Sequence, residues 1–261
     1  MKIKQYLDKL FARGRHSFTR KELERELALS QNVIGVGLNR LKKAEEIVSL
    51  ARGYYIMIPL EYRSLGCLPA SQFVPDLMKH LDMPYYVCLL SAAEFYGAAH
   101  QKPQVFQVMI PFMRKNLHIG KIRVHFHKNK YLAKSPIKKF NSERGYLQVS
   151  TPEATAMDLV AYPGPSAGFS NVLTVLEELT ESMDVSAFKD LLQVKGQITD
   201  LQRMGYLFEL LNEERFAEVI EKHLKGRNPD KAILEPRGSS REGEYSRRWK
   251  LIINELIESD L

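Results

Sequence analysis

The sequence predicts an α+β protein in which a small basic N-terminal part is followed by a larger mixed α/β part with a helical C-terminal half. Two observations predict this division. Helix-type and strand-type hydrophobic periodicities alternate along the 261 residues. Charge is also segregated, because residues 1–58 hold 12 basic and 6 acidic side chains whereas residues 145–221 hold 4 basic and 13 acidic ones. With 44% hydrophobic and 26% charged residues, the chain has the composition of an ordinary globular protein.

Composition also argues against several classes of protein. The two cysteines, Cys67 and Cys88, stand in no metal-binding spacing, so we predict neither a zinc site nor a disulfide framework. No apolar run approaches the roughly 18 residues of a membrane helix, and the first residues lack the apolar stretch of a signal peptide. We therefore expect a cytoplasmic protein with no membrane partner, no metal and no cofactor.

Three short helices are predicted at the start of the chain. Residues 3–12 place their apolar side chains at the spacing of one helix face. Thr19 followed by Glu22 is a capping box, which predicts a second helix from the next residue onward. Ser30 is the expected N-cap of a third helix over residues 31–43.

A β-hairpin is predicted after the third helix. Residues 47–50 and 54–58 read as its strands, joined by a tip that contains Arg52, and residues 17–18 are a short extended link able to pair as an edge strand. Three helices followed by a hairpin is the order of a winged helix-turn-helix, so residues 1–58 are predicted to form one.

The third helix carries the candidate DNA-binding surface. Ile34, Leu38 and Leu41 mark its buried stripe, and amide and basic side chains face away from it. Such side chains suit base edges and phosphates. Gly35 and Gly37 each cost about 1 kcal/mol of helix propensity, which a close approach to a groove wall or to the second helix would explain. The predicted DNA-contacting residues are Thr19, Gln31, Asn32, Gly35, Asn39, Arg40, Lys42, Lys43 and Arg52. The alternatives are a solvated basic face and a helical domain that makes protein contacts.

The larger part is predicted to follow a linker over residues 59–70 and to span residues 71–261. We expect a helix from Ser71 that ends before Pro84, a buried apolar helix over 85–99, and a helix capped by Thr151 that continues to about residue 161. The remaining predicted elements are strands at 105–110, 122–127, 146–149 and 232–234, four acidic amphipathic helices at 170–181, 185–194, 198–211 and 213–223, and a last strand or helix that holds Trp249.

A second basic segment lies outside the predicted winged helix. Residues 113–144 hold ten basic side chains and one acidic one, which indicates either a solvated face or a second nucleic-acid contact. His125 and His127 share one face of a predicted strand, but neighbouring lysines would repel a cation, so we expect a solvent-facing pair rather than a metal site. The residues of this second patch are Arg114, Lys115, Lys121, Arg123, Lys128 and Lys130.

No catalytic residue is predicted. Glu153 and Asp158 stand five apart on one helix and diverge by about 140°, a poor geometry for paired carboxylates. Glu153 is better explained as a partner of the helix dipole, and Asp158 as a partner of Arg203. Nucleophile-elbow and phosphate-loop motifs are missing from the sequence, so we expect a protein that is not an enzyme.

Four stretches carry a resemblance to a known family. Residues 85–97, 149–160 and 203–207 are similar, in this order, to its S-A-x-x-x-x-G, S-T-P-E-x-T-x-x-D-L and R-x-G-Y-L segments, and residues 234–236 with Trp249 are similar to its C-terminal part. The chain resembles the AbiEi-type antitoxins of type IV toxin–antitoxin systems. The matching residues are Ser91, Gly97, Thr151, Pro152, Glu153, Thr155, Asp158, Arg203, Gly205 and Tyr206.

The chain departs from the family pattern at two positions. Ala154 and Met157 replace an expected Arg and Leu, and this puts any polar role of that helix in question.

The resemblance implies a function for each part of the chain. It implies that the N-terminal domain binds operator repeats in double-stranded DNA and represses its own operon. It implies that the C-terminal domain neutralises a nucleotidyltransferase-like toxin in an abortive-infection type of phage defence, without necessarily touching the toxin. Two other functions stay open: a nucleic-acid-processing enzyme that uses residues 113–144, and a protein-interaction module that uses the acidic helices of residues 145–221.

Overall fold

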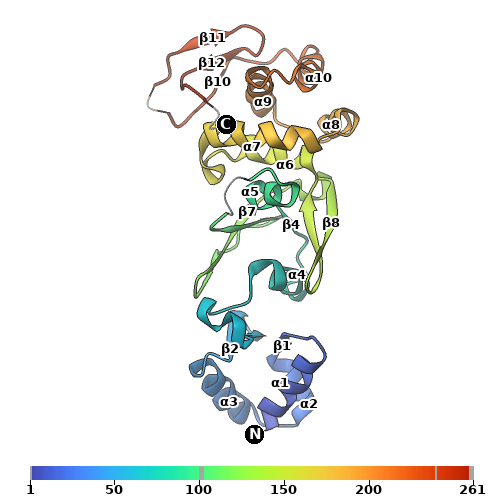
Figure 1. Ribbon diagram of the computed structural model, residues 1–261, viewed down its shortest axis with the longest axis vertical. Coiled ribbons are helices and arrows are strands. Elements are labelled where there is room, and N and C mark those ends of the chain that lie inside the picture. The colour runs from blue at the N-terminus through green and yellow to red at the C-terminus, as the bar shows by residue number, and fades with distance from the viewer. Residues whose placement is uncertain (1, 100–102, 239, 259–261) are drawn as a thin grey trace. The chain divides into compact units, whose positions relative to one another are not determined.

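The computed structural model describes residues 2–99, 103–238 and 240–258, and it shows an α+β protein (Figure 1). The chain forms two compact units. Unit 1 comprises Met1–Tyr85, Gln104–Lys130 and Lys139–Gln148, and unit 2 comprises Tyr86–Pro103, Tyr131–Lys138 and Val149–Leu261. Compactness therefore groups the N-terminal helices with several later strands, and the two units do not divide at the linker predicted over residues 59–70.

Three helices open unit 1 at the predicted positions, and the predicted capping residues start the second and the third. The capping box of α2 is present in full, because Thr19 Oγ1 accepts a hydrogen bond from the Glu22 amide and the Glu22 carboxylate accepts one from the Thr19 amide. The Ser30 hydroxyl accepts a hydrogen bond from the Val33 amide at the start of α3. The helices are α1 (Lys2–Ala12), α2 (Arg20–Leu27) and α3 (Gln31–Lys43).

A three-stranded antiparallel sheet completes this N-terminal region, which we call the head (residues 2–58). Its strand order is β1-β3-β2, so the short β1 is an edge strand as the sequence indicates. A bulge between Ser49 and Ala51 precedes the turn at Arg52 and Gly53. The strands are β1 (Ser17–Thr19), β2 (Ile47–Ala51) and β3 (Tyr54–Met57).

The head has its own apolar core, and one glycine of α3 is explained by it. Ile34, Leu38 and Leu41 are buried as predicted, together with Leu23 of α2. A Cβ atom at Gly37 would lie 2.5 Å from the Cδ1 atom of Ile3. The close approach that this glycine permits is therefore to α1, and not to α2 or a groove wall.

The segment expected as a linker is packed into unit 1. It contains a 3-10 helix, η1 (Leu60–Leu65), and the buried side chains of Cys67 and Leu68. These side chains belong to a core formed by the hairpin of the head and α4 (Ala70–His80). Residues 59–70 are therefore held in place by burial.

The strands of the basic segment form a mixed sheet region in unit 1. Strand β7 pairs in parallel with β5 and antiparallel with β6, which places Phe106 and Leu117 beside Val124 on its two sides. The predicted alternation along β7 is present, because Val124 and Phe126 are buried and Arg123 is exposed. The strands are β5 (Phe106–Ile110), β6 (Leu117–Ile119) and β7 (Ile122–Lys128).

Strands β8 (Ile137–Ser142) and β9 (Gly145–Ser150) follow, and only β9 is predicted from the sequence. Strand β8 has no fully buried residue, so no apolar alternation marks it. Strand β6 has only three residues, which is too short for a periodicity to emerge.

The helix predicted over residues 85–99 is wrong. The structure has strand β4 (Tyr86–Val87), helix α5 (Leu89–Ala93) and a 3-10 turn, η2 (Glu94–Tyr96). Val87 pairs in parallel with Val149 of β9, and Cys88 is extended. A continuous apolar run fits a buried strand as well as a buried helix, so pairing with a distant strand decides the conformation here.

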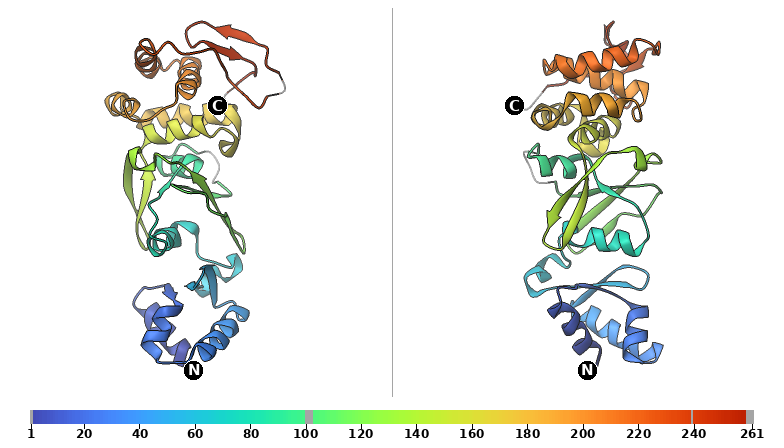
Figure 2. Two further views of the ribbon diagram at one scale, coloured as in Figure 1. Left: turned by 180° about the vertical axis from the view of Figure 1, so that it is seen from behind. Right: turned by 90° about the vertical axis from the view of Figure 1, so that its right-hand side faces the viewer.

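The helical half of unit 2 matches the sequence prediction closely. Three aromatic side chains hold α8, α9 and α10 together, with ring centroids 5.6 Å apart for Phe188 and Phe216 and 5.2 Å apart for Phe208 and Phe216. Figure 2 shows α9 and α10 side by side. None of the helices over the described residues is long and apolar enough to cross a membrane. The helices are α6 (Pro152–Ala161), α7 (Gly168–Leu179), α8 (Val185–Leu192), α9 (Ile198–Leu210) and α10 (Glu214–Leu224).

A small C-terminal sheet packs against α9. Its order is β10-β12-β11, with β10 (Ala232–Ile233) parallel and β11 (Glu244–Ser246) antiparallel to β12 (Leu251–Ile253). The buried Trp249 precedes β12 and lies directly over Gly205 of α9. The structure thus forms a strand over Leu251–Ile253, one of the two predicted options, but Trp249 lies in the turn before this strand and not within it.

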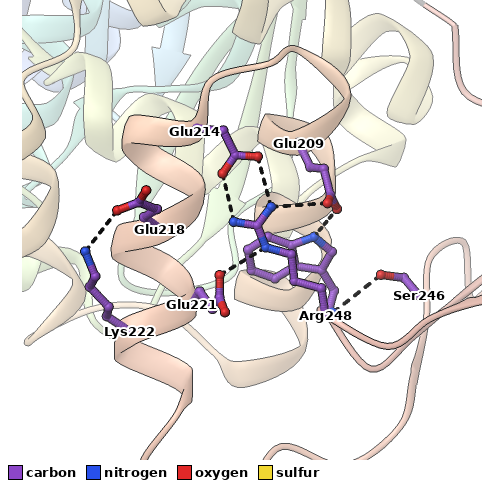
Figure 3. Close-up of polar contacts among 8 residues, drawn as sticks. Glu209, Glu214, Glu218, Glu221, Lys222, Ser246 and Arg248 are labelled. Atoms are coloured by element: carbon purple, nitrogen blue, oxygen red, sulfur yellow. Dashed lines mark hydrogen bonds and ion pairs between the residues drawn. The ribbon is translucent and has the colours of Figure 1, made fainter.

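Arg248 joins this C-terminal sheet to α9 and α10 (Figure 3). Its guanidinium contacts three carboxylates, with N···O distances of 2.8 Å to Glu214, 3.0 Å to Glu221 and 3.2 Å to Glu209. The hydrogen bonds that the guanidinium donates to Glu214, Glu209 and Glu221 raise the pKa of Arg248 above its usual value, against the opposing effect of burial. The guanidinium also lies 4.9 Å from the Trp249 ring, where it fixes the indole over α9.

Gly205→Ala is expected to destabilise unit 2. A Cβ atom at this position would lie 2.2 to 2.5 Å from three carbon atoms of the Trp249 ring, and overpacking of this kind costs about 1–3 kcal/mol. Urea unfolding followed by tryptophan fluorescence measures the loss. Gly226→Ala is the matched control because nothing lies within 4 Å of its Cβ position. Equal stability of the two variants would contradict the packing described for Trp249.

Candidate functional site

The outward face of α3 is an exposed part of the head that carries amide and basic side chains. At 100° per residue, Asn32, Val36, Asn39 and Lys43 lie within an arc of about 60°, and all four are exposed. The buried stripe of the helix occupies the opposite side. The helix therefore presents two amides, one cation and one apolar side chain along a single line.

Most of the predicted contact residues are free to meet a ligand. Gln31, Asn32, Asn39, Arg40, Lys42, Lys43 and Arg52 are exposed, and Gly35 is half-exposed. Lys42 Nζ lies 5.2 Å from the centroid of the Tyr55 ring, a contact with the central strand of the small sheet. Thr19 differs from the others, because it is half-buried and its hydroxyl caps α2.

Two exposed valines on α3 are missing from the sequence prediction. Val33 and Val36 are 52% and 66% exposed. β-Branched residues lose rotamer freedom in a helix, and here no packing compensates for that loss. Their position away from the buried stripe is the sequence signal that marks them.

A polar cluster fixes the start of α2 against α1. Arg15 Nη1 lies 2.7 Å from Glu22 Oε1, and the Tyr6 hydroxyl donates to the same oxygen at 2.9 Å. Burial alone would raise the pKa of Glu22, but these hydrogen bonds outweigh it and the pKa is lowered. Burial and Glu22 together raise the pKa of Tyr6 to about 12. The cluster therefore holds the two helices that support α3.

The second basic patch is also largely exposed. Lys115, Lys121, Arg123, Lys128 and Lys130 are exposed. Arg114 is the exception: it is half-buried, its guanidinium lies 5.6 Å from the Phe126 ring, and burial lowers its pKa.

The histidines of β7 are half-buried rather than solvent-facing. His125 stacks on His118 of β6 with ring centroids 5.9 Å apart. Burial lowers the pKa of His125, and the neighbouring His118 and Arg123 add to this effect. Within the described part of the chain, no group of three or more His, Cys, Asp or Glu side chains has a metal-binding arrangement.

The family-type motif at the start of α6 is buried and bonded internally. Thr151 caps the helix and Pro152 occupies its first turn, as predicted. Thr155 Oγ1 lies 2.6 Å from Ser150 Oγ, which in turn donates to the Val87 carbonyl at 3.3 Å. The motif thereby joins α6 to β4 and β9.

Glu153 has a partner beyond its own helix. It is 5% exposed and accepts a hydrogen bond from the Asp184 amide at 2.9 Å. Its carboxylate therefore ties the first turn of α6 to the start of α8, in addition to any interaction with the helix dipole.

The predicted pair of Asp158 and Arg203 is wrong. Asp158 is 1% exposed, and its carboxylate lies 2.6 Å from Lys195 Nζ and accepts a hydrogen bond from the Tyr86 hydroxyl at 3.0 Å. Lys195 Nζ also lies 3.0 Å from Ser135 Oγ. Lys195 stands in the turn after α8, where no sequence pattern identifies it as a partner.

The remaining motif residues have structural roles at several positions in unit 2. Arg203 donates two hydrogen bonds to the Ile233 carbonyl and pairs with Asp200 at 3.1 Å, so it holds β10 rather than Asp158. Burial raises the pKa of Asp200, and Arg203 opposes this shift. Ser91 is buried in α5, Gly97 ends η2 with φ 75°, Gly205 lies under Trp249, and Tyr206 is half-buried on α9.

The motif residues lie in a segment that matches a known family. Residues 85–210 match the family model of the AbiEi antitoxin C-terminal domain. This segment belongs to the AbiEi antitoxin C-terminal domain family. The resemblance found in the sequence is thereby confirmed. Ala154 and Met157 are both buried in α6 of this AbiEi domain, so the two departures from the family pattern lie in its apolar core.

A solved structure shares the fold. The chain is similar to the crystal structure of the RV2827C protein from Mycobacterium tuberculosis, with a TM-score of 0.66 and 14% sequence identity. The similarity covers 95% of this chain and 90% of that one, and at this identity it concerns the fold alone. No curated protein matches the chain.

Lys195→Met is expected to destabilise unit 2 by about 3 kcal/mol, because it leaves the Asp158 carboxylate buried without its cation. The double variant with Asp158→Asn should be more stable than Lys195→Met alone, and urea unfolding of the single and double variants measures this coupling. Arg203→Met is the control. Its effect on the free energy of unfolding should add to that of Asp158→Asn. A coupling free energy between these two positions would contradict the structure, in which Asp158 and Arg203 are not paired.

Proposed function

We propose that the chain is the antitoxin and transcriptional autorepressor of a type IV toxin–antitoxin system. In this proposal residues 1–58 are a winged helix-turn-helix that binds operator repeats in double-stranded DNA. The exposed face of α3 carries the proposal, because it lines up amide and basic side chains on one side of a capped helix.

The arrangement of the head supports DNA binding. Helix α3 follows α2 directly and packs on it, and the turn between β2 and β3 offers the exposed Arg52 as a wing contact. The excess of basic residues over 1–58 suits a polyanion, since phosphate neutralisation releases counterions. We assign Asn32, Asn39 and Arg40 to base edges, and Lys42, Lys43 and Arg52 to phosphates.

The AbiEi domain supports the antitoxin half of the proposal. The toxin is a nucleotidyltransferase-like protein, and neutralisation does not require direct contact with it. The buried motif residues act as the framework of this domain. No catalytic role is proposed for them, because Asp158 forms an ion pair with Lys195 and Glu153 accepts a hydrogen bond from the Asp184 amide.

The second basic patch is proposed as an additional DNA contact. The cations of β7 and of its turn with β6 are exposed in unit 1, the unit that also contains the head. Such a contact would add to affinity for every sequence alike, because phosphates carry no sequence information.

Replacement of Arg40 and Arg52 by Ala is expected to weaken binding to the chain's own promoter at least tenfold in a mobility-shift assay. Wild-type affinity should fall steeply between roughly 50 and 200 mM salt, and each lost phosphate contact should reduce the salt slope by about one. Arg241→Ala with Arg247→Ala, both in the exposed C-terminal region, is the charge-matched control. Unchanged binding by the head variant would refute the assigned surface.

The second basic patch is tested by measuring the same salt slope for Lys121→Ala with Arg123→Ala. A slope reduced by about two would show that the patch contacts DNA phosphates, and an unchanged slope would show that it does not.

Co-expression with the toxin gene next to its own tests the antitoxin role. The wild-type chain should restore growth, and Arg40→Ala with Arg52→Ala should still do so while a promoter reporter is derepressed. Loss of repression and of rescue in the same variant, at unchanged protein level, would show that the two roles do not divide between the head and the AbiEi domain.

A further inference from the structure

We infer that Val33 and Val36 form an apolar contact surface on α3 that recognises the 5-methyl groups of thymines in the major groove. The inference rests on the proposed DNA-binding function and adds to it a base identity. It predicts that the operator presents A·T pairs to the middle of α3.

The position of Val36 is the first step. It lies between Asn32 and Asn39 in the exposed arc of α3, one turn from each. Val33 flanks the same arc, beside Arg40. An α-helix that enters the major groove with this face places Val36 nearest to the base edges, because the buried stripe holds the opposite side of the helix against the head.

The chemistry of the two side chains is the second step. Val33 and Val36 are 52% and 66% exposed, so neither is explained by the core of the head. The thymine methyl is the apolar group that a base pair offers in the major groove. A valine in a helix is held in essentially one χ1 rotamer, so its two methyl groups are already oriented before contact.

The neighbours of Val36 support the same base pair. Asparagine recognises adenine through N6 and N7, and the two asparagines of the arc are exposed beside the valine. An A·T pair satisfies both residue types, with the amide on adenine and the valine on the thymine methyl. Gly35 adds room on this side of α3, because open space surrounds its Cβ position and the backbone can approach the bases closely.

Deoxyuridine substitution gives a direct test, because it removes only the methyl group from thymine. Duplexes of the promoter carry deoxyuridine in place of each thymine in turn, and mobility shifts measure the affinity of the full-length chain for each. The wild type should lose about fourfold in affinity at one or two thymines, the effect of withdrawing one buried methyl group. Val36→Ser should bind the unmodified duplex more weakly and should be indifferent to deoxyuridine at one of those positions.

Matched variants and a fold check complete the test. Serine and valine have similar helix propensities, so the thermal unfolding midpoint of Val36→Ser should match that of the wild type. Val194→Ser is the control, because Val194 is 50% exposed and lies outside the head. It should retain the full response to deoxyuridine.

The possible failures are distinguishable. Tight promoter binding that ignores every deoxyuridine overturns the valine contact and leaves the DNA-binding proposal standing. Persistence of the thymine effect in both Val33→Ser and Val36→Ser overturns it as well. Absence of any promoter binding by the wild type overturns the DNA-binding proposal and this inference together.

Discussion

The buried ion pair between Asp158 and Lys195 is the interaction on which unit 2 depends. It joins α6 to the turn after α8, and the hydrogen bonds from Tyr86 and to Ser135 extend it to β4 and to the segment before β8. Two charges taken out of water are stable only when each has its partner and its remaining hydrogen bonds. The ion pair therefore fixes the positions of β4, α6 and the turn after α8 relative to one another.

The other residues of the family motif serve the same framework. Thr155 bonds to Ser150, Glu153 holds the start of α8, and Gly205 admits the indole of Trp249. These contacts are buried and mutually satisfied, which is typical of a structural network rather than a reaction centre. The recognisable part of the AbiEi domain is therefore the part that determines its fold.

In the head, the stabilising contacts and the residues with low helix propensity lie in different places. Its helices begin at well-formed caps, and the cluster around Glu22 fixes α2 to α1. The outward face of α3, by contrast, carries exposed valines and a glycine that no internal contact requires. Residues that lower helix stability therefore lie where a ligand is proposed to bind, as expected for a recognition surface.

The sequence by itself determined the helices of the head, the helices of the C-terminal half and the family of the C-terminal domain. Capping residues, helical periodicity and the alternation along β7 depend on neighbours in the chain, and the family motif is a run of residues in order. Tertiary structure alone decided that Tyr86 and Val87 form a strand, that Lys195 and not Arg203 faces Asp158, and that Gly37 admits Ile3. Each of these depends on a partner that is distant in sequence, and neither spacing nor composition specifies which distant group burial will bring within contact distance.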